Sequence, residues 1–313
     1  MQHISRSIPK ALGALMILLA FNTANGQQDP MFAQYMFNML AINPAYAGSA
    51  EAVSLRAISR HQWTGFDGAP TTQTLTGHSP VWHESLCLGG TILRDEHGPV
   101  EQLGIFVDVA YRIHFDNAKL SFGLKGGVNI FQGKFSELNP LDPDDIVFQD
   151  DVSSNVSPNF GFGVMYYSER YYVGLSAPKL SNTKWLSVDS LETVVQNGQQ
   201  QHYFLTAGYV FDLNNYVKFK PSFLVKAVEG APWNVDLTAN FLFYDKFWLG
   251  AMYRYQDAVG ALLQYQITDS FTAGYVYEYS VTPLSKYSGG THEIMIGYDI
   301  GSKTQGVRSP RYF

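Results

Sequence analysis

The chain has 313 residues, of which 46% are hydrophobic and 15% aromatic, whereas only 15% are charged. Soluble domains usually carry charge on about a quarter of their residues, so this composition is unusual for a soluble protein. The formal net charge of −6 disfavours nucleic acid as a partner, because surfaces that bind nucleic acid are basic. Cys87 is the only cysteine, which excludes a disulfide within one chain, and we interpret it as a small strand residue rather than a nucleophile.

Residues 1–26 have the pattern of a signal peptide. Arg6 and Lys10 precede an apolar run over 11–21 that is too short to span a bilayer, and Ala24 and Gly26 place small residues at the two positions that a signal peptidase reads. We predict cleavage after Gly26 and secretion across the inner membrane; the alternative is an uncleaved anchor. No other segment approaches 18 consecutive apolar residues, which argues against a helical membrane protein.

Residues 27–50 precede the first strand and do not alternate. Asp29 and Pro30 are typical of a helix start, and Asn43 before Pro44 is typical of a helix end. Between them apolar side chains recur at helical spacing: Phe32, Tyr35, Met36 and Met39. We therefore predict a short helix. We favour a role in sealing the periplasmic end of a barrel over a plug or a docking element for a periplasmic partner.

From residue 51 onward, apolar residues alternate with polar or small ones, as in the run from Phe271 to Tyr279. A period of two is typical of strands with one apolar and one polar face. We predict an all-β fold, a transmembrane up-and-down antiparallel β-barrel of about 14 strands with its apolar face outward, over 51–300. The expected strands are 51–63, 70–79, 86–94, 101–115, 119–132, 158–167, 171–180, 201–212, 216–228, 233–244, 246–256, 258–267, 270–281 and 291–300.

The connections between these strands support that count. Successive connections lie at alternate ends of an up-and-down barrel. The tight turns all fall at one end, at 116–118, 169–170, 213–215, 245 and 268–269, and the long connections all fall at the other, at 133–157, 181–200 and 282–290. Bacterial outer-membrane barrels have short periplasmic turns and long extracellular loops. This places both ends of the barrel in the periplasm, together with a C-terminal tail over 301–313.

Charged residues fall on the predicted inward face. Lys218, Lys220 and Lys226 share that face of one strand, and the others are Asp108, Arg112, Lys119, Lys125, Asp236, Glu278, Glu293 and Asp299. Fourteen strands enclose more space than side chains usually fill, so water or a plug must occupy the lumen. The charges could form a pairing network or line a pore, and the pattern does not choose between these.

No sequence motif indicates an enzyme site. A phosphate-binding loop and a His-Glu-x-x-His pattern are both missing from the sequence, so we expect no catalytic residue and no cofactor. We interpret His78 and His83 as turn histidines rather than metal ligands. The loop 139–151 contains Asp142, Asp144 and Asp145, which could hold Ca²⁺, but we favour a solvated acidic loop because the spacing does not match an EF-hand.

The loop 181–200 is unusually apolar for an extracellular segment. Its apolar side chains include Trp185, Leu186, Val188 and Leu191. Exposed apolar patches are typical of protein-binding surfaces. This loop is therefore our candidate for partner binding; the alternative is that it folds inward over the barrel mouth.

Several segments resemble one family, the PorP/SprF outer-membrane proteins of type IX secretion and gliding motility. The N-terminal match is carried by Gln34, Tyr35, Asn38, Asn43, Pro44 and Gly48, and the end of the first strand by Arg60, Gln62 and Trp63. Further matches are 70–72, 292–298 and the ending 309–313. Met39 departs from the pattern, in which proline follows the asparagine.

The resemblance implies a non-enzymatic outer-membrane barrel of Bacteroidota that acts beside the type IX secretion machine. Such proteins help to export and anchor a large secreted surface protein or adhesin through its C-terminal sorting domain, and a periplasmic peptidoglycan-associated protein is a further partner. The alternative function is a porin-like channel or transporter for small solutes.

Overall fold

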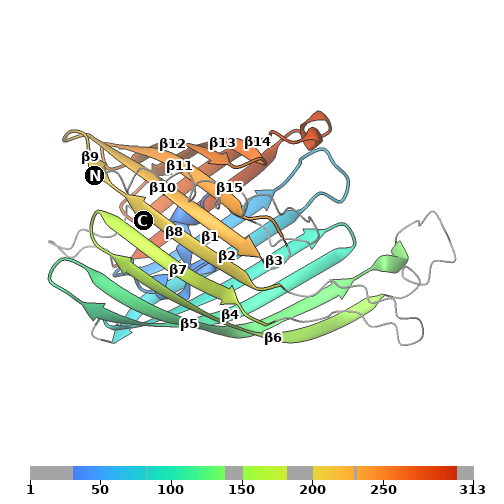
Figure 1. Cartoon of the computed structure of the whole chain (residues 1–313), viewed down its shortest axis with the longest axis horizontal. Helices are drawn as coiled ribbons and strands as arrows, with labels where there is room; N and C mark the ends of the chain where they lie inside the picture. Colours follow the sequence, from blue (N-terminus) through green and yellow to red (C-terminus); the bar gives the residue numbers. More distant parts are fainter. Residues whose placement is uncertain (1–30, 83, 138–150, 182–199, 229–230, 302–313) are drawn as a thin grey trace, which may run out of the picture.

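The computed structural model describes residues 31–82, 84–137, 151–181, 200–228 and 231–301. They form one closed antiparallel β-barrel with a short irregular segment inside it (Figure 1). The strands are β1 Val53–His61, β2 Thr71–Trp82, β3 Leu86–His97, β4 Val100–His114, β5 Lys119–Gly133, β6 Val152–Tyr167, β7 Tyr171–Lys179, β8 His202–Tyr209, β9 Phe211–Asp212, β10 Val217–Val228, β11 Asn234–Phe243, β12 Phe247–Arg254, β13 Ala258–Gln266, β14 Phe271–Ser280 and β15 Thr291–Ile300.

These fifteen labelled segments make a wall of fourteen strands, as predicted. Each strand pairs with the next along the chain, and the barrel closes where β1 pairs with β15. Both β8 and β9 pair with β10 in one continuous register, so together they occupy a single position in the wall. The ladder is interrupted opposite Lys220 and Pro221 of β10, and Pro221 has no backbone N–H to donate to a sheet.

Side chains alternate between the two faces of the wall. On β4, Ile105, Val107 and Val109 are exposed on the outside, whereas Asp108 and Arg112 point inward and are buried. The outer face is apolar around the barrel, while polar and charged groups face the interior. Only a lipid environment accommodates such an outer face, and the prediction of a transmembrane barrel is confirmed.

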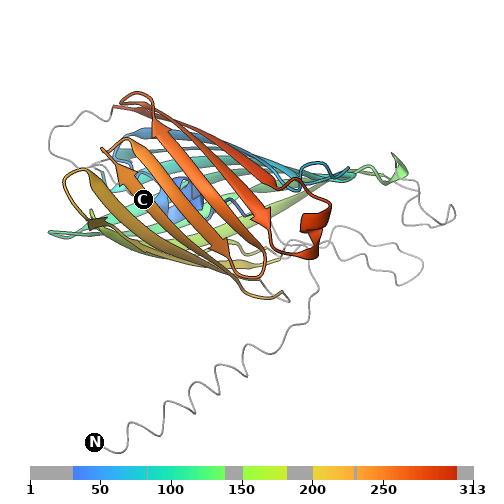
Figure 2. The same cartoon turned by 90° about the horizontal axis from the view of Figure 1, so that it is seen from above.

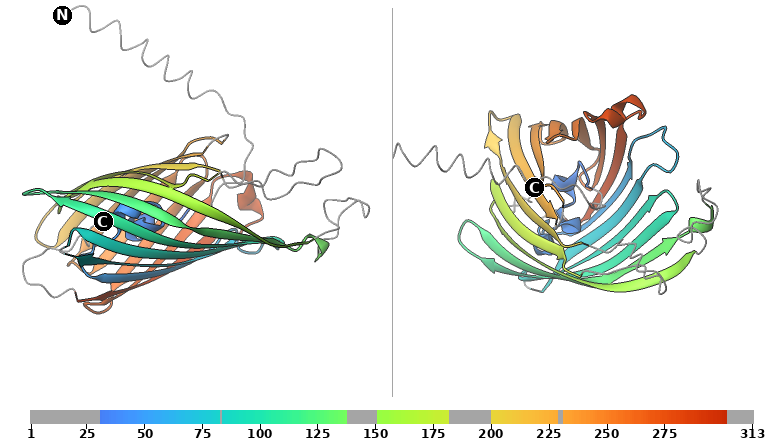
Figure 3. Two further views of the ribbon diagram at one scale, coloured as in Figure 1. Left: turned by 90° about the horizontal axis from the view of Figure 1, so that it is seen from below. Right: turned by 45° about the vertical axis from the view of Figure 1, so that its right-hand side comes forward.

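The N-terminal segment is helical, as predicted, but not as one continuous helix. It forms three short 3-10 turns, η1 Tyr35–Phe37, η2 Met39–Ala41 and η3 Pro44–Tyr46. The segment lies inside the barrel, where Figures 2 and 3 show it as a blue coil enclosed by strands. A continuous helix would satisfy its own backbone, whereas here side chains of the wall bond to several backbone groups of the segment.

The barrel has two distinct rims. The short-turn rim carries the turns 115–118, 168–170, 213–216, 244–246 and 267–270. The opposite rim, which we call the long-connection rim, carries the connections that follow β1, β5, β7 and β14, the last containing η6 Pro283–Lys286. The predicted parity of short and long connections is therefore confirmed by the strand order and its antiparallel pairing.

Strand β6 begins at Val152, six residues before the predicted start at Pro158. Residues 152–157 are mostly polar, and a proline usually ends a strand. Here β6 extends past β7, since the two strands pair only from Phe162 onward. The backbone of Pro158 therefore pairs with β5 alone, at Val128, where the lack of an N–H is tolerated.

Among the described residues, no helix has the length and apolar character needed to cross a membrane.

Candidate functional site

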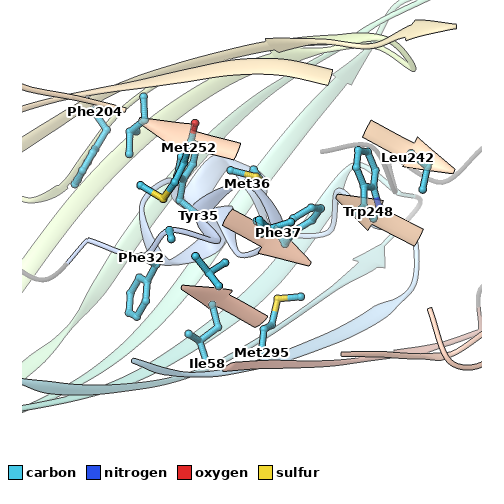
Figure 4. Packing of buried hydrophobic residues seen from close by; sticks show 14 residues of the cluster. Phe32, Tyr35, Met36, Phe37, Ile58, Phe204, Leu242, Trp248, Met252 and Met295 are labelled. Atoms are coloured by element: carbon cyan, nitrogen blue, oxygen red, sulfur yellow. The ribbon is translucent and has the colours of Figure 1, made fainter. Parts of the chain in front are cut away.

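The lumen is occupied by residues 31–50, which we call the plug; the segment thus lies inside the barrel and does more than seal one end, the role that the sequence analysis favours. Nearly all of its side chains are buried. Its first half packs against inward-facing apolar side chains of the wall, and Figure 4 shows this cluster at close range. The cluster joins Phe32, Ala33, Tyr35, Met36 and Phe37 of the plug to Ile58, Phe204, Leu224, Leu242, Trp248, Met252, Leu262, Val276 and Met295 of the wall. The plug is thus part of the folded core.

A buried carboxylate holds the first turn of the plug near the long-connection rim. The two side-chain oxygens of Glu293, on β15, accept hydrogen bonds from the backbone N–H groups of Ala33 and Gln34, each at 2.9 Å. The Glu293 side chain is fully buried. A charged acceptor makes stronger hydrogen bonds than a neutral one, so Glu293 clamps the plug to the wall.

The clamp belongs to a larger network of buried charges. Arg60 Nη1 lies 3.1 Å from Glu293 and also contacts Glu278, whose other oxygen accepts from Arg60 Nη2 at 3.0 Å. On the far side, Arg254 Nη1 donates to Glu278 at 3.1 Å and Nε donates to Asp236 at 2.9 Å. These five side chains alternate in sign, and each is at most 4% exposed. Buried charges are tolerated only when paired in this way.

The middle of the plug makes polar contacts with three other parts of the wall. Thr76 Oγ1 on β2 donates to Asn38 Oδ1 at 2.7 Å, and Ser176 Oγ on β7 donates to the carbonyl of Ile42 at 2.7 Å. Lys125 Nζ on β5 donates to the carbonyl of Leu40 at 3.5 Å and also pairs with Asp108 of the wall at 2.9 Å. The plug is consequently bonded around the barrel and not along one side only.

Glycines in the wall make room for the second half of the plug. Asn43 caps η3 through its side chain, which accepts from the Ala45 N–H at 2.9 Å. A Cβ added at Gly163 on β6 would overlap Asn43, and one added at Gly123 on β5 would overlap the backbone of Pro44 and Ala45. The plug backbone therefore approaches the wall where the wall has no side chain.

The last turn of the plug is fixed near the short-turn rim. Gly48 adopts φ +73°, a left-handed conformation that favours glycine. Its N–H donates to His78 Nδ1 at 3.1 Å, and its carbonyl accepts from Arg112 Nη2 at 2.9 Å. Arg112 also lies 2.7 Å from the sulfur of Cys87, which is fully buried. The two bonds at Gly48 hold the chain where it leaves the lumen to begin β1.

The residues on which the sequence resemblance to the family was based come together on and around the plug. Gln34, Tyr35, Asn38, Asn43, Pro44 and Gly48 lie within it. Arg60 reaches the clamp, 233 positions from Glu293 in sequence. Gln62 and Trp63 follow β1, where the Gln62 N–H donates to the Pro70 carbonyl and the Trp63 N–H to Thr291 Oγ1. These two residues therefore shape the long-connection rim beside the clamp.

The predicted inward charges have three different surroundings. Asp108, Arg112, Lys125, Lys220, Lys226, Asp236, Glu278 and Glu293 are buried inside the barrel. Lys119 and Lys218 lie near the short-turn rim, where they pair with Glu51 and Asp245, and Asp299 pairs with Arg56 at 2.9 Å. Arg254 was not among the predicted inward charges, although its alternation with Trp248 and Met252 on β12 places it on the inner face.

Two groups of candidate residues fall outside the described chain. Trp185, Leu186, Val188 and Leu191 belong to 182–199, and Asp142, Asp144 and Asp145 belong to 138–150. In the part of the chain that is described, no group of three His, Cys, Asp or Glu side chains is placed to hold a metal ion. Beside the acidic loop, Asp151 accepts hydrogen bonds from the N–H and hydroxyl of Ser136, which lower the pKa of its carboxyl.

The sequence matches one protein family, and the structure is similar to several solved β-barrels. The sequence profile of the family described as type IX secretion system membrane protein PorP/SprF matches residues 24–298. No curated protein matched the chain. A Pseudomonas aeruginosa FadL homologue is 12% identical with a TM-score of 0.44, and the match covers 88% of this chain and 96% of that one. The KdgM porin is 9% identical with a TM-score of 0.38, covering 79% and 98%, and a mutant Rh. blastica porin is 7% identical with a TM-score of 0.35, covering 79% and 98%.

Proposed function

Because this chain belongs to the PorP/SprF family of type IX secretion system membrane proteins, we propose that it helps to export and anchor a secreted surface protein at the outer membrane. It acts without catalysis and holds the partner through the partner's C-terminal sorting domain. In this proposal the signal peptide is cleaved after Gly26 in a member of the Bacteroidota, and the anchored protein serves surface attachment or gliding.

The observation that carries this proposal is the filled lumen. A porin needs a continuous water-filled path, whereas here the plug is bonded to the wall near both rims, through Glu293 at one end and Gly48 at the other. A barrel whose lumen holds a plug bonded in this way is suited to serve as a membrane-embedded support. Its remaining working surfaces are the two rims.

We assign one partner to each rim of the barrel. The long-connection rim meets the secreted protein, with Trp185, Leu186, Val188 and Leu191 as the apolar contacts. The short-turn rim faces the periplasm, where a peptidoglycan-associated protein would bind. Long loops on the outside and short turns in the periplasm are the rule for bacterial barrels, and this rule supports the assignment.

Conductance separates this proposal from the porin alternative. We expect the purified full-length protein to give no steady channel current in planar lipid bilayers, because the plug blocks the lumen. A general porin of known conductance, reconstituted in the same bilayers, confirms that insertion is being detected. Steady single-channel currents from the wild-type protein would overturn the anchor proposal in favour of a solute channel.

A pull-down from the native outer membrane tests the partner directly. We expect the tagged protein to recover a large secreted protein that carries a type IX sorting domain. Replacing Trp185, Leu186, Val188 and Leu191 together by serine should reduce the recovery more than about tenfold, because a few apolar contacts usually dominate such interfaces. Leu284→Ser with Tyr287→Ser, on the exposed connection before β15, is the control and should retain the partner. Equal recovery from both variants would remove loop 181–200 from the binding surface.

A further inference from the structure

Strand β6 has an open edge close to the long-connection rim. From Val152 to Gly161 the strand pairs with β5 on one side, whereas β7 pairs with its other side only from Phe162 onward. The last backbone bond on the β7 side runs from the Leu180 N–H to the Phe160 carbonyl, at 2.9 Å. Figures 1 and 2 show that β5 and β6 project together from this rim. Beyond Phe160, no strand of the described chain covers the edge.

The bond at Phe160 shows which backbone groups lie on this edge. In an antiparallel sheet, the backbone groups of successive residues point alternately to the two neighbouring strands. Because the Phe160 carbonyl points away from β5, the backbone groups of Pro158, Val156 and Ser154 do so as well. Ser154 and Val156 each offer an N–H and a carbonyl, whereas Pro158 offers only a carbonyl. The edge therefore presents a row of donors and acceptors at strand spacing.

The open edge lies beyond the apolar band of the outer face. At the same level of the neighbouring strands β3, β4 and β5, the outward side chains are polar: Arg94, Glu96, Glu101 and Gln132. Arg94 Nε donates to Glu101 at 2.7 Å, and both side chains are more than a third exposed. Unpaired backbone groups are costly in hydrocarbon but not in water. The edge is therefore placed where a water-soluble partner can reach it.

The inner side of the same edge carries buried polar atoms. Ser157 Oγ and Asn159 Oδ1 are buried and have no hydrogen-bond partner within the described part of the chain, although Asn159 Nδ2 donates to the Pro178 carbonyl at 2.9 Å. Val156, by contrast, points outward and is 57% exposed. A ligand that completes this edge thus needs main-chain donors and acceptors, apolar groups on the outer side and polar groups on the inner side.

An extended peptide with alternating apolar and polar side chains meets these three requirements. We propose that a segment of the secreted partner pairs with β6 from Ser154 to Phe160 and so adds a strand to the wall. This inference rests on the proposed function, because the edge continues the long-connection rim that we assign to that partner. Main-chain hydrogen bonds supply the affinity in such strand addition, and the alternate side chains supply the specificity.

A proline at position 156 tests the backbone of the edge. Val156→Pro removes an N–H that points away from β5, so the variant should keep the urea unfolding curve of the wild type. In the pull-down from the native outer membrane it should reduce recovery of the secreted protein about fivefold or more, because a carbonyl of the added strand is left without a donor. Val156→Thr keeps the N–H and the branched side chain, and as the matched control it should recover the partner as the wild type does.

The outcomes for this inference and for the anchor itself can be told apart. Equal recovery by Val156→Pro and Val156→Thr would overturn the added strand and leave the anchor in place. If the wild type recovered no secreted protein, the anchor would fail, and the added strand would fail with it.

Photo-cross-linking in the native outer membrane identifies what occupies the edge. We expect p-benzoylphenylalanine introduced at Val156 to cross-link to the secreted protein. The same group at Val107, which is 59% exposed on the lipid-facing side of β4, is the control and should give no such product. The proposal is overturned if the group at Val156 cross-links only to residues 182–199 of its own chain, only to a second copy of the protein, or to no protein at all.

Discussion

Replacing Arg60 by methionine should release the plug from its clamp and destabilise the barrel. Arg60 lies between Glu278 and Glu293, and all three side chains are buried. Without the guanidinium, the carboxylates of Glu278 and Glu293 remain buried. The nearest group that could neutralise them is Arg254, which already forms an ion pair with Asp236. Breaking a buried ion pair from one side typically costs about 3–5 kcal/mol, and we expect a loss of that size in the free energy of unfolding.

Three measurements distinguish release of the plug from the loss of stability. Urea unfolding in lipid vesicles gives the free energy. Hydrogen exchange at the amides of Ala33 and Gln34 reports the clamp, because both N–H groups are protected by Glu293. We expect their exchange to accelerate in Arg60→Met by a larger factor than that of amides in the barrel wall. Planar bilayers should then show currents that the wild type lacks.

Arg56→Met is the matched control for this experiment. Arg56 lies on the same strand with its side chain on the same face, and it pairs with Asp299 at 2.9 Å with both side chains about one-fifth exposed. Partly exposed pairs contribute at most about 1 kcal/mol, so we expect a small change and no release of the plug. If the two variants lost equal stability, or if the plug amides stayed protected in Arg60→Met, the network around Glu293 would not be what holds the plug.

The barrel could be predicted because each wall residue has only two directions to face. Alternation from Phe271 to Tyr279 identifies a strand whose one side meets lipid, and the same alternation sends Lys220 and Glu293 inward. The parity of short and long connections adds a second, independent constraint on the number of strands. Pro158 breaks the pattern, and the predicted strand therefore began too late. Proline is tolerated in β6 because β6 pairs on one side only at this point, and this depends on where the neighbouring strand β7 ends.

The path of the plug could not be predicted in the same way. The spacing of Phe32, Tyr35, Met36 and Met39 fits a helix equally well, and what decides against it is the set of partners that the wall supplies. Glu293 is 260 positions from Ala33 in sequence, and nothing in the local pattern joins them. The inward charges were visible, but only the closed barrel brings Arg60, Glu278 and Arg254 into one network.

Replacing Gly123 by alanine should displace the plug by steric conflict alone. Gly123 lies on the inner face of β5, where an added Cβ would overlap the backbone of Pro44 and Ala45. Backbone cannot move aside as the end of a flexible side chain can, and the chain just before η3 is fixed by the hydrogen bond that Ser176 donates to the Ile42 carbonyl. Overpacking of this kind costs about 1–3 kcal/mol, and we expect a loss in the upper part of that range.

Gly126→Ala on the same strand separates the steric conflict from the general effect of replacing a glycine. No atom lies within 4 Å of the Cβ position at Gly126, so the substitution should change the free energy of unfolding by less than about 0.5 kcal/mol. Urea unfolding compares the stability of the two variants. Hydrogen exchange at the amide of Gly48, which is bonded to His78 of the wall, reports displacement of the plug. Faster exchange in Gly123→Ala with unchanged exchange in Gly126→Ala is the expected result, and similar behaviour of the two variants would show that the plug is not seated against β5.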